Sequence, residues 1–408
     1  MLQLGNDVSP CLQQCRSERL YGLGGLTYTT PVTIGQATVN AGSLTAGEMP
    51  ARAYPGLDAL RGIAALLVAL FHFRGNFLGY NNYPSGDGYL AVDVFFVLSG
   101  FVLSHAYLSR FARGMTVWQF VKIRLIRLYP LYFIGLMLGM VNLLAGYEPR
   151  GALSNLDIAR AFTMELFMLP SWPTLYDRLF LINVVSWSLF FEMLVNILFV
   201  VFWKRLTPKA LLRIIIASGL IVAAFSIYRH NASMGNFWRT SPIGLARTLL
   251  SFSMGILIYK LHRGGAIRFH ASPLIFALAA LLLVFCLLYP VPSSVRGYYD
   301  LIFIFLIGPL LVLLGSSPRL EQKWLPLFTF LGSTSYALYA THANGLPLVK
   351  ALTERYFIHA SVLTVSLLAV TLATLFAYAL DIVYDRPVRK MLTARFGGKS
   401  AGGTTKRI

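Results

Sequence analysis

The chain has 408 residues, of which 56% are hydrophobic and only 12% are charged, and its formal net charge is +19. Soluble domains carry about 25% charged residues, so this composition argues against a soluble enzyme of one or two domains. The positive charge does not indicate a nucleic-acid partner, because lysine and arginine lie mostly in short stretches between apolar segments, the pattern that orients membrane proteins.

The first 52 residues differ in composition from the rest of the chain. They are rich in Gly, Thr, Ser and Gln, and they show neither helical periodicity nor an apolar core of signal-peptide length. We predict a disordered leader over residues 1–52, a transmembrane domain over residues 53–392 and a flexible basic tail over residues 393–408. Cys11 and Cys15 lie in the leader without further ligands at suitable spacing, so the sequence predicts no metal site.

Long apolar runs begin at Leu57 and repeat along the chain. Because about 20 mostly apolar residues cross a bilayer, we predict an all-α polytopic membrane protein, a bundle of about ten transmembrane helices. The predicted spans are residues 57–75, 88–108, 128–146, 183–203, 211–228, 243–261, 272–290, 298–316, 328–348 and 357–382. Residues 162–170 are apolar but too short to span, which indicates a re-entrant or interfacial segment.

The distribution of positive charge predicts the orientation of this bundle. With the N-terminus in the cytoplasm, 25 of the 35 lysines and arginines fall on the cytoplasmic side. Cytoplasmic loops of membrane proteins carry such an excess. An even number of spans keeps the basic C-terminal cluster on that side, so we predict that both termini are cytoplasmic in a multi-pass protein of the cell membrane, of the bacterial inner membrane type.

The first span carries two ionisable residues, Arg61 and His72. Eleven residues exceed three full helical turns by only about 20°, so both side chains lie on one helix face, about 16 Å apart along the axis. Ionisable groups inside a span are costly and are functional candidates by default. Alternatively, His72 bonds a neighbouring helix and Arg61 reaches a lipid phosphate.

The second span places Asp93, Ser99 and Gly100 inside the membrane. Asp93 and Gly100 are seven residues apart and therefore share a helix face. A Ser-Gly step lets another helix or a ligand approach the backbone closely. Gly100 therefore predicts close helix packing, Ser99 is a candidate ligand contact, and Asp93 is a candidate for the catalytic site.

A basic motif precedes the third span. Arg124 and Arg127 are three residues apart and project to the same side of a helix. Two guanidinium groups at the inner membrane face can hold a phosphorylated ligand through bidentate contacts. Lipid headgroups are the alternative partner. Tyr132 completes this motif on the following helical turns.

Two later spans add more polar side chains. Ser188 and Glu192 are four residues apart and share a face, and the Glu192 carboxylate requires a partner, for which a buried arginine is the obvious choice. The ninth span carries a polar stripe in steps of three residues, formed by Tyr336, Tyr339 and His342. So many polar groups in apolar segments predict a polar cavity among the helices.

Several of these motifs occur in one ordered series. They are Leu57-Asp58-Ala59-Leu60-Arg61-Gly62, the Arg61–His72 spacing, the run from Val92 to Gly100, Arg-x-x-Arg-x-x-Pro-x-Tyr at 124–132, Trp187-Ser188-Leu189-x-x-Glu192, Gly332 to His342, and Arg386-Pro387. In this series the chain resembles the acyltransferase-3 family of membrane O-acyltransferases, from about Leu57 to Arg389. It departs from the family at Val195-Asn196, where many members have Phe-Tyr, and at Asp385, where many have Glu.

The resemblance implies transfer of an acyl group, usually acetyl, from cytoplasmic acyl-CoA to a hydroxyl of an extracytoplasmic or exported glycan. It implies that His72 is the catalytic base and that Arg61, Arg124 and Arg127 belong to the donor site. Acyl-CoA, acetyl-CoA first, is then a co-substrate, no cofactor is bound permanently, and the other partners are a carbohydrate or glycolipid acceptor and the lipid bilayer. Neutral imidazole suits proton abstraction near neutral pH, and His72 could also carry the acyl group itself.

With His72, we place Asp93 and Glu192 in the predicted catalytic site, and Ser99 and Tyr132 in the predicted donor-binding site. A multi-pass transporter or flippase of a polar or glycan substrate is the main alternative function, since helices with intramembrane charges also describe many carriers. Carriers often show two related halves, and the sequence contains no such repeat. The sequence specifies neither the acceptor nor the acyl chain length.

Overall fold

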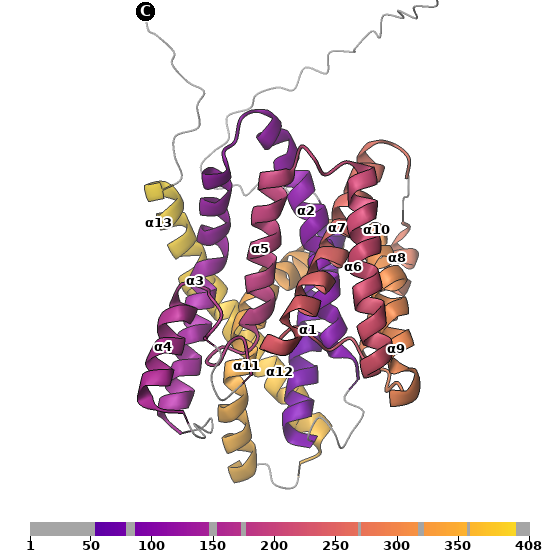
Figure 1. Cartoon of the computed structure of the whole chain (residues 1–408). Coiled ribbons are helices and arrows are strands. Elements are labelled where there is room, and N and C mark those ends of the chain that lie inside the picture. The colour runs from indigo at the N-terminus through magenta and orange to yellow at the C-terminus, as the bar shows by residue number, and fades with distance from the viewer. Residues whose placement is uncertain are drawn as a thin grey trace, which may run out of the picture. The chain divides into compact units, whose positions relative to one another are not determined.

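Helices make up almost all of the chain that the computed structural model describes (Figure 1). The described residues are 54–78, 86–146, 153–172, 177–267, 271–316, 322–356 and 360–396. All of them belong to the unit Arg52–Ile408. The predicted leader, with Cys11 and Cys15, and the predicted tail beyond residue 396 lie outside the described residues.

The helices follow one another along the described chain in the following order. The first seven are α1 (Pro55–Leu78), α2 (Ala91–Ala112), α3 (Val117–Leu144), α4 (Asn155–Leu166), α5 (Ser186–Phe202), α6 (Pro208–Arg229) and α7 (Ser241–Arg263). The later ones are α8 (Pro273–Leu288), α9 (Ser293–Ile302), α10 (Gly308–Gly315), α11 (Leu325–Tyr356), α12 (Val362–Leu380) and α13 (Arg386–Phe396). The described residues contain no strand, only an isolated bridge between Arg178 and Phe237.

Short helical turns of other types join some of these helices. Single 3₁₀ turns precede α2, α7 and α11, namely η1 (Gly88–Leu90), η2 (Trp238–Thr240) and η4 (Gln322–Trp324). Two π-helical segments, η3 (Phe303–Ile307) and η5 (Asp381–Asp385), connect α9 to α10 and α12 to α13. Such π-turns are inserted within longer helices, so each of these pairs forms one continuous helical run.

Each of the ten predicted spans falls on one of these helices or continuous runs. Seven stretches of the described chain are long and apolar enough to cross a membrane, namely Pro55–Gly75, Gly88–Ala112, Val117–Leu144, Pro208–Arg229, Trp238–Arg263, Ser293–Gly315 and Val362–Phe396. α5 and α8 are apolar but shorter, and the long α11 is not among the seven. The protein is therefore an all-helical, multi-pass membrane protein. The count of ten spans and the cytoplasmic position of both termini stay predictions.

The short apolar segment predicted over residues 162–170 includes the end of α4, which has 12 residues and is too short to span. Glu165, near its end, is fully buried and fixes the connection to α5. Its carboxylate accepts backbone N–H bonds from Leu181 at 2.6 Å, Ile182 at 2.9 Å and Asn183 at 3.1 Å. Burial raises the pKa of this carboxyl, while the hydrogen bonds that it accepts act in the opposite direction.

α2 and α7 cross at two glycines. A Cβ atom on Gly100 would collide with the carbonyl oxygen of Phe252, and a Cβ on Gly255 would collide with that of Val97. The two backbones are therefore in direct contact, an arrangement that small residues allow in membrane bundles. The packing role predicted for Gly100 is confirmed.

α1 packs more extensively on α11 than on any other helix, and α11 also contacts α3 and α12. Gly62 permits this contact, because a Cβ there would meet the backbone and side chain of Leu331. Figure 1 shows α3, α4 and α13 on one side of the view and α6, α8, α9 and α10 on the other, with α1 and α2 between them. α1 and α11 are thus the pair around which the polar side chains gather.

Candidate active site

Two histidines from distant parts of the chain meet where α1 packs on α11. The Nε2 atom of His342 lies 3.2 Å from the Nδ1 atom of His72, and the two ring centroids are 5.0 Å apart. His342 is only 1% exposed, whereas His72 is half-buried. Because 270 residues separate them along the chain, only the fold brings them together.

The hydrogen bonds around this pair assign its protons. The Nδ1 atom of His342 faces the carbonyl oxygens of Leu338 at 3.1 Å and Tyr339 at 3.0 Å, so it carries hydrogen and leaves Nε2 as an acceptor. The Nδ1 atom of His72 lies between that acceptor and the carbonyl oxygen of Val68 at 2.9 Å, so it must carry hydrogen too. The Nε2 atom of neutral His72 therefore keeps its lone pair, and among the described residues it has no hydrogen-bond partner. This arrangement can accept one proton at a defined atom.

Arg61 is held against α11 on the same face of α1 as His72. Its Nε atom donates to Ser335 Oγ at 2.9 Å. Its Nη2 atom donates to the Asp58 carboxylate at 2.9 Å and to the Gly332 carbonyl oxygen at 2.6 Å. The shared partner helix confirms the common face that the eleven-residue spacing predicted. The role of Arg61 toward a donor stays a prediction.

Three predicted site residues meet at one carboxylate oxygen. Oε1 of Glu192 accepts hydrogen bonds from Arg124 Nη2 at 2.7 Å and from Ser99 Oγ at 3.0 Å. The side chains of Arg124 and Glu192 are 6% and 19% exposed. Glu192 thus joins α5 to α3 and α2, and its predicted buried arginine partner is Arg124. A buried ion pair of this kind neutralises both charges, so Arg124 is not an open cation at the membrane face.

Arg127 is a cation of this region for which the described residues supply no partner. Its side chain is exposed, and within the described part of the chain it makes neither a hydrogen bond nor an ion pair. It lies in electrostatic range of Arg61, Arg124 and Arg389, which all carry the same charge. The two arginines of the motif therefore differ in state, because Arg124 is neutralised and Arg127 is available for an anionic ligand.

Tyr132 is fully buried at the contact between α3 and α4. Its hydroxyl donates to the carbonyl oxygen of Glu165, and Tyr129 donates to that of Leu166 at 2.9 Å. The hydroxyl proton of Tyr132 is therefore used within the protein. Its assignment to the donor site stays a prediction.

Asp93 belongs to a saturated ion pair between α2 and α7. Arg247 Nε donates to its two carboxylate oxygens at 2.9 and 3.0 Å, Nη2 also bonds it, and Ser251 Oγ donates at 3.2 Å. Arg247 further donates to the carbonyl oxygens of Ala232 at 2.8 Å and Tyr89 at 3.0 Å. Both charged residues are 1% exposed. In the described structure Asp93 bonds neither histidine, so its catalytic role stays a prediction while its packing role is evident.

The polar stripe of α11 contacts three neighbouring helices. Tyr339 and Ser188 of α5 share a hydrogen bond of 2.6 Å, and the Tyr336 hydroxyl donates to the Leu128 carbonyl oxygen of α3 at 2.6 Å. His342 contacts His72 of α1, so the stripe makes one polar contact with each of α1, α3 and α5. The predicted stripe therefore connects α11 to the three helices that carry Ser188, Leu128 and His72.

A family model described as an acyltransferase domain, Acyl_transf_3, matches residues 54–382. The chain belongs to the acyltransferase-3 family. The matched region runs from the start of α1 into η5 and contains every predicted site residue. The protein is therefore a membrane acyltransferase, and the resemblance drawn from the motifs is confirmed. The Arg386-Pro387 ending lies just beyond the match.

Three known proteins, among others, are similar to parts of this acyltransferase. Protein 2 in the picA locus of Rhizobium radiobacter is 35% identical over 187 residues, which cover 43% of this chain and 95% of that protein. The O-acetyltransferase OatA of Staphylococcus aureus is 35% identical over 81 residues, 19% of this chain and 12% of that protein. The peptidoglycan O-acetyltransferase OatA of Listeria monocytogenes is 25% identical over 189 residues, 42% of this chain and 28% of that protein. No solved structure gives a significant match to the chain.

The sequence-based interpretation of this acyltransferase missed one residue of consequence, Arg247. An arginine within the apolar run 243–261 was the signal, since such a residue requires a partner. The contact of His342 with His72 had no signal in the spacing along either helix. Among the described residues, no group of His, Cys, Asp and Glu is placed to hold a metal ion.

Proposed function

We propose that this acyltransferase moves an acyl group, acetyl in the first place, from cytoplasmic acyl-CoA to a hydroxyl of a cell-envelope glycan, with His72 as the general base. Membership of the family and the two O-acetyltransferases among its relatives support the reaction type and the carbohydrate acceptor. One observation carries the role of His72. Its contact with His342 leaves the Nε2 atom with a free lone pair at a half-buried position.

The proposed reaction transfers one proton and one acyl group. The acceptor hydroxyl gives its proton to Nε2 of His72 while its oxygen attacks the carbonyl carbon of the thioester. The carbon–sulfur bond then breaks, and the acyl group remains on the acceptor oxygen as an ester. The leaving thiolate takes the proton back from the imidazolium and departs as the CoA thiol. His72 ends the cycle in its starting state.

In this proposal His342 is a positioning residue. When the ring of His72 becomes positive, its Nδ1–H still points at the neutral Nε2 atom of His342, 3.2 Å away. That hydrogen bond becomes charge-assisted and stronger as the proton is taken up. The carbonyl oxygens of Leu338 and Tyr339 keep His342 in the tautomer that accepts. The orienting third group of a nucleophile–base arrangement has the same task in other enzymes.

On the donor side, the unpaired Arg127 is the first candidate to bind phosphates of acyl-CoA. Arg61 shares a face of α1 with His72 and lies about 16 Å from His72 along the helix axis. Arg124 acts indirectly, because it is bound to Glu192 and holds that carboxylate in place. Guanidinium groups suit phosphate recognition through paired hydrogen bonds.

The test is a direct assay on the purified full chain. With acetyl-CoA as donor, we expect release of free CoA thiol by the wild type, and loss of that release with His72→Gln. In cells, deleting the gene should remove ester-linked acetyl from a surface glycan, and the wild-type gene, but not the His72→Gln gene, should restore it. A transporter or flippase would move a substrate across the membrane while leaving acetyl-CoA intact. Intact acetyl-CoA together with unchanged glycan esters would contradict the proposal.

A further inference from the structure

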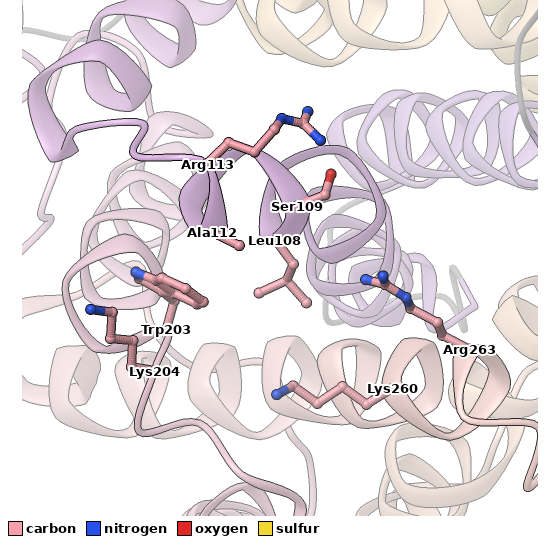
Figure 2. A pocket seen from close by; sticks show the side chains of 8 residues that line it. All are labelled: Leu108, Ser109, Ala112, Arg113, Trp203, Lys204, Lys260 and Arg263. Atoms are coloured by element: carbon pink, nitrogen blue, oxygen red, sulfur yellow. The ribbon is translucent and has the colours of Figure 1, made fainter. Parts of the chain in front are cut away.

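A hollow of about 540 Å³ opens beside the C-terminal ends of α2 and α7 and the residues that follow α5 (Figure 2). Its lining consists of Leu108, Ser109, Ala112, Arg113, Trp203, Lys204, Lys260 and Arg263. Half of these residues are cationic and none is acidic. Figure 2 shows the cationic side chains arranged around the apolar Leu108. The hollow therefore has an apolar floor and a positively charged rim.

The described part of the protein does not compensate the positive charges of the rim. Within the described residues, the side chains of Arg113, Lys204, Lys260 and Arg263 make no ion pair and no hydrogen bond. Lys204 has only the ring of its neighbour Trp203, 5.7 Å from its ammonium group. Basic residues near helix C-termini favour the helix dipole, which accounts for their presence at the ends of α2 and α7. It does not account for the hollow between them, where like charges repel unless an anion enters.

Two ring contacts place this hollow relative to the candidate base. Tyr54, at the start of α1, lies against His105, with centroids 4.9 Å apart, and Phe71 lies against Tyr89 at 6.1 Å. α1 and α2 are therefore antiparallel, and the hollow lies near the start of α1. Tyr89 lies in η1, which leads directly into α2, and Ser109 follows twenty residues later near the end of α2. That separation corresponds to about 30 Å along the helix axis from the level of the candidate base.

Arg127 is within electrostatic reach of Arg61 on α1 and has no partner among the described residues. It is within electrostatic reach of Tyr107, the residue that precedes the lining of the hollow on α2. Uncompensated positive charge thus continues from the hollow toward α1. A ligand that fills both places must be long and must carry negative groups over one half, with its reactive group at the far end.

We propose that the hollow binds the phosphorylated adenosine end of the acyl-CoA donor. This inference rests on the proposed function, in which acyl-CoA is the donor. Acyl-CoA has the required build, since its 3′-phosphate and adenine lie at one end, its diphosphate follows, and its thioester is at the other end. Lys260 and Arg263 bind the 3′-phosphate through charge-assisted hydrogen bonds, and Trp203 provides aromatic surface for the adenine. Arg127 is then left for the diphosphate.

The experiment compares two ligands that differ by one phosphate. CoA and dephospho-CoA, which lacks the 3′-phosphate, are titrated into the purified full chain in neutral detergent. The variants are Lys260→Gln/Arg263→Gln and a matched control, Arg110→Gln/Arg205→Gln, which removes two exposed charges outside the hollow. We expect the wild type and the control to bind CoA about tenfold or more tightly than dephospho-CoA, as one lost charged contact implies. The hollow variant should bind both ligands equally.

The outcomes separate this inference from the proposed function. If the hollow variant keeps the wild-type ratio of the two dissociation constants, the hollow does not hold the 3′-phosphate, and the donor proposal stands. If the wild type binds neither ligand, the donor proposal fails and takes this inference with it. If the hollow variant keeps the ratio but loses binding of phosphatidylglycerol in nanodiscs, the hollow is a lipid headgroup site and the inference is wrong. Equal thermal unfolding of the two double variants checks that both remain folded.

Discussion

The α2–α7 and α1–α11 interfaces both contain ionisable side chains inside the bundle, yet the two interfaces use them differently. Between α2 and α7, the carboxylate of Asp93 is bonded by Arg247 and Ser251, and the ion pair is almost fully buried. Between α1 and α11, His342 is buried, but His72 is half-buried and keeps one ring nitrogen unbonded among the described residues. The Asp93 carboxylate is fully hydrogen-bonded, whereas the His72 ring keeps one acceptor atom without a partner among the described residues.

Under the proposed function, this difference distinguishes a structural group from a reactive one. A buried carboxylate with every oxygen bonded has no capacity left for a substrate, and disrupting it leaves an uncompensated charge. A general base must instead keep an accessible acceptor atom within hydrogen-bond reach of the acceptor hydroxyl. Burial of an ionisable residue in a membrane bundle is therefore a weaker indication of catalysis than a free bonding position. The following substitutions test that distinction.

The largest effect is expected for His72→Gln. Glutamine keeps size and hydrogen bonding but takes up no proton at neutral pH, so turnover should fall by about 10² to 10⁴. The measurement is the rate of acetyl transfer or of thiol release, with CoA binding and thermal unfolding as controls that should stay near the wild type. His72→Ala should show the same loss. Near-normal turnover of His72→Gln would show that His72 is structural.

Next in size is the loss of the buried ion pair. Arg247→Gln leaves the Asp93 carboxylate buried without its charge partner, which should lower the free energy of unfolding by about 3–5 kcal/mol. The double variant Asp93→Asn/Arg247→Gln should be destabilised by less than the sum of the two single variants, because each single variant leaves an uncompensated buried charge and the double variant leaves none. The measurement is the free energy of unfolding of the purified wild type, of each single variant and of the double variant. An Arg247→Gln protein as stable as the wild type would show that this pair does not hold α2 to α7.

A smaller effect is expected for His342→Leu, which removes the acceptor for the Nδ1 proton of His72. The loss of one hydrogen bond to a charged group should slow turnover about 10- to 100-fold. If His342 acts only through His72, adding His342→Leu to His72→Gln should cause no further loss. A further tenfold drop in the double variant would mean that His342 has a catalytic task of its own.

The smallest effect is expected for Arg127→Ala. Because Arg127 is exposed and unpaired, its removal should weaken apparent acetyl-CoA affinity about tenfold and leave turnover at saturating donor nearly unchanged. Lys122→Ala, a change of the same charge on the same helix, serves as the matched control. Unchanged donor affinity with Arg127→Ala would return this arginine to the role of a lipid anchor.

Much of the fold could be predicted from the sequence, because each apolar run marks one helix. The ends of the helices were less predictable where charged residues belong to a helix that continues into the apolar run. The third span was predicted to begin at residue 128, after the basic motif, but α3 begins at Val117 with a capping box formed by Thr116 and Gln119. The basic motif is thus the first part of a helix that continues into the membrane. Local capping decided the start of this helix, and apolarity alone did not.

Prediction of the site succeeded within single helices and stopped between them. The helical repeat placed Arg61 and His72 on one face, and the need of a buried carboxylate for a partner anticipated an arginine for Glu192. The pairing of His72 with His342 depends on how α1 and α11 are placed against each other. Spacing along one helix contains no information on that placement, so no motif could indicate it.

The ion pair between Asp93 and Arg247 also has a consequence for biosynthesis. The two residues are 154 positions apart, and ribosomes add about 5–20 residues per second, so Asp93 is made roughly 8 to 30 s before its arginine exists. During that interval the nascent α2 has no arginine to pair with its carboxylate, and an uncompensated charge inside the bilayer is costly. The arrival of α7 then supplies the arginine, which makes assembly of this bundle depend on a partner from the second half of the chain.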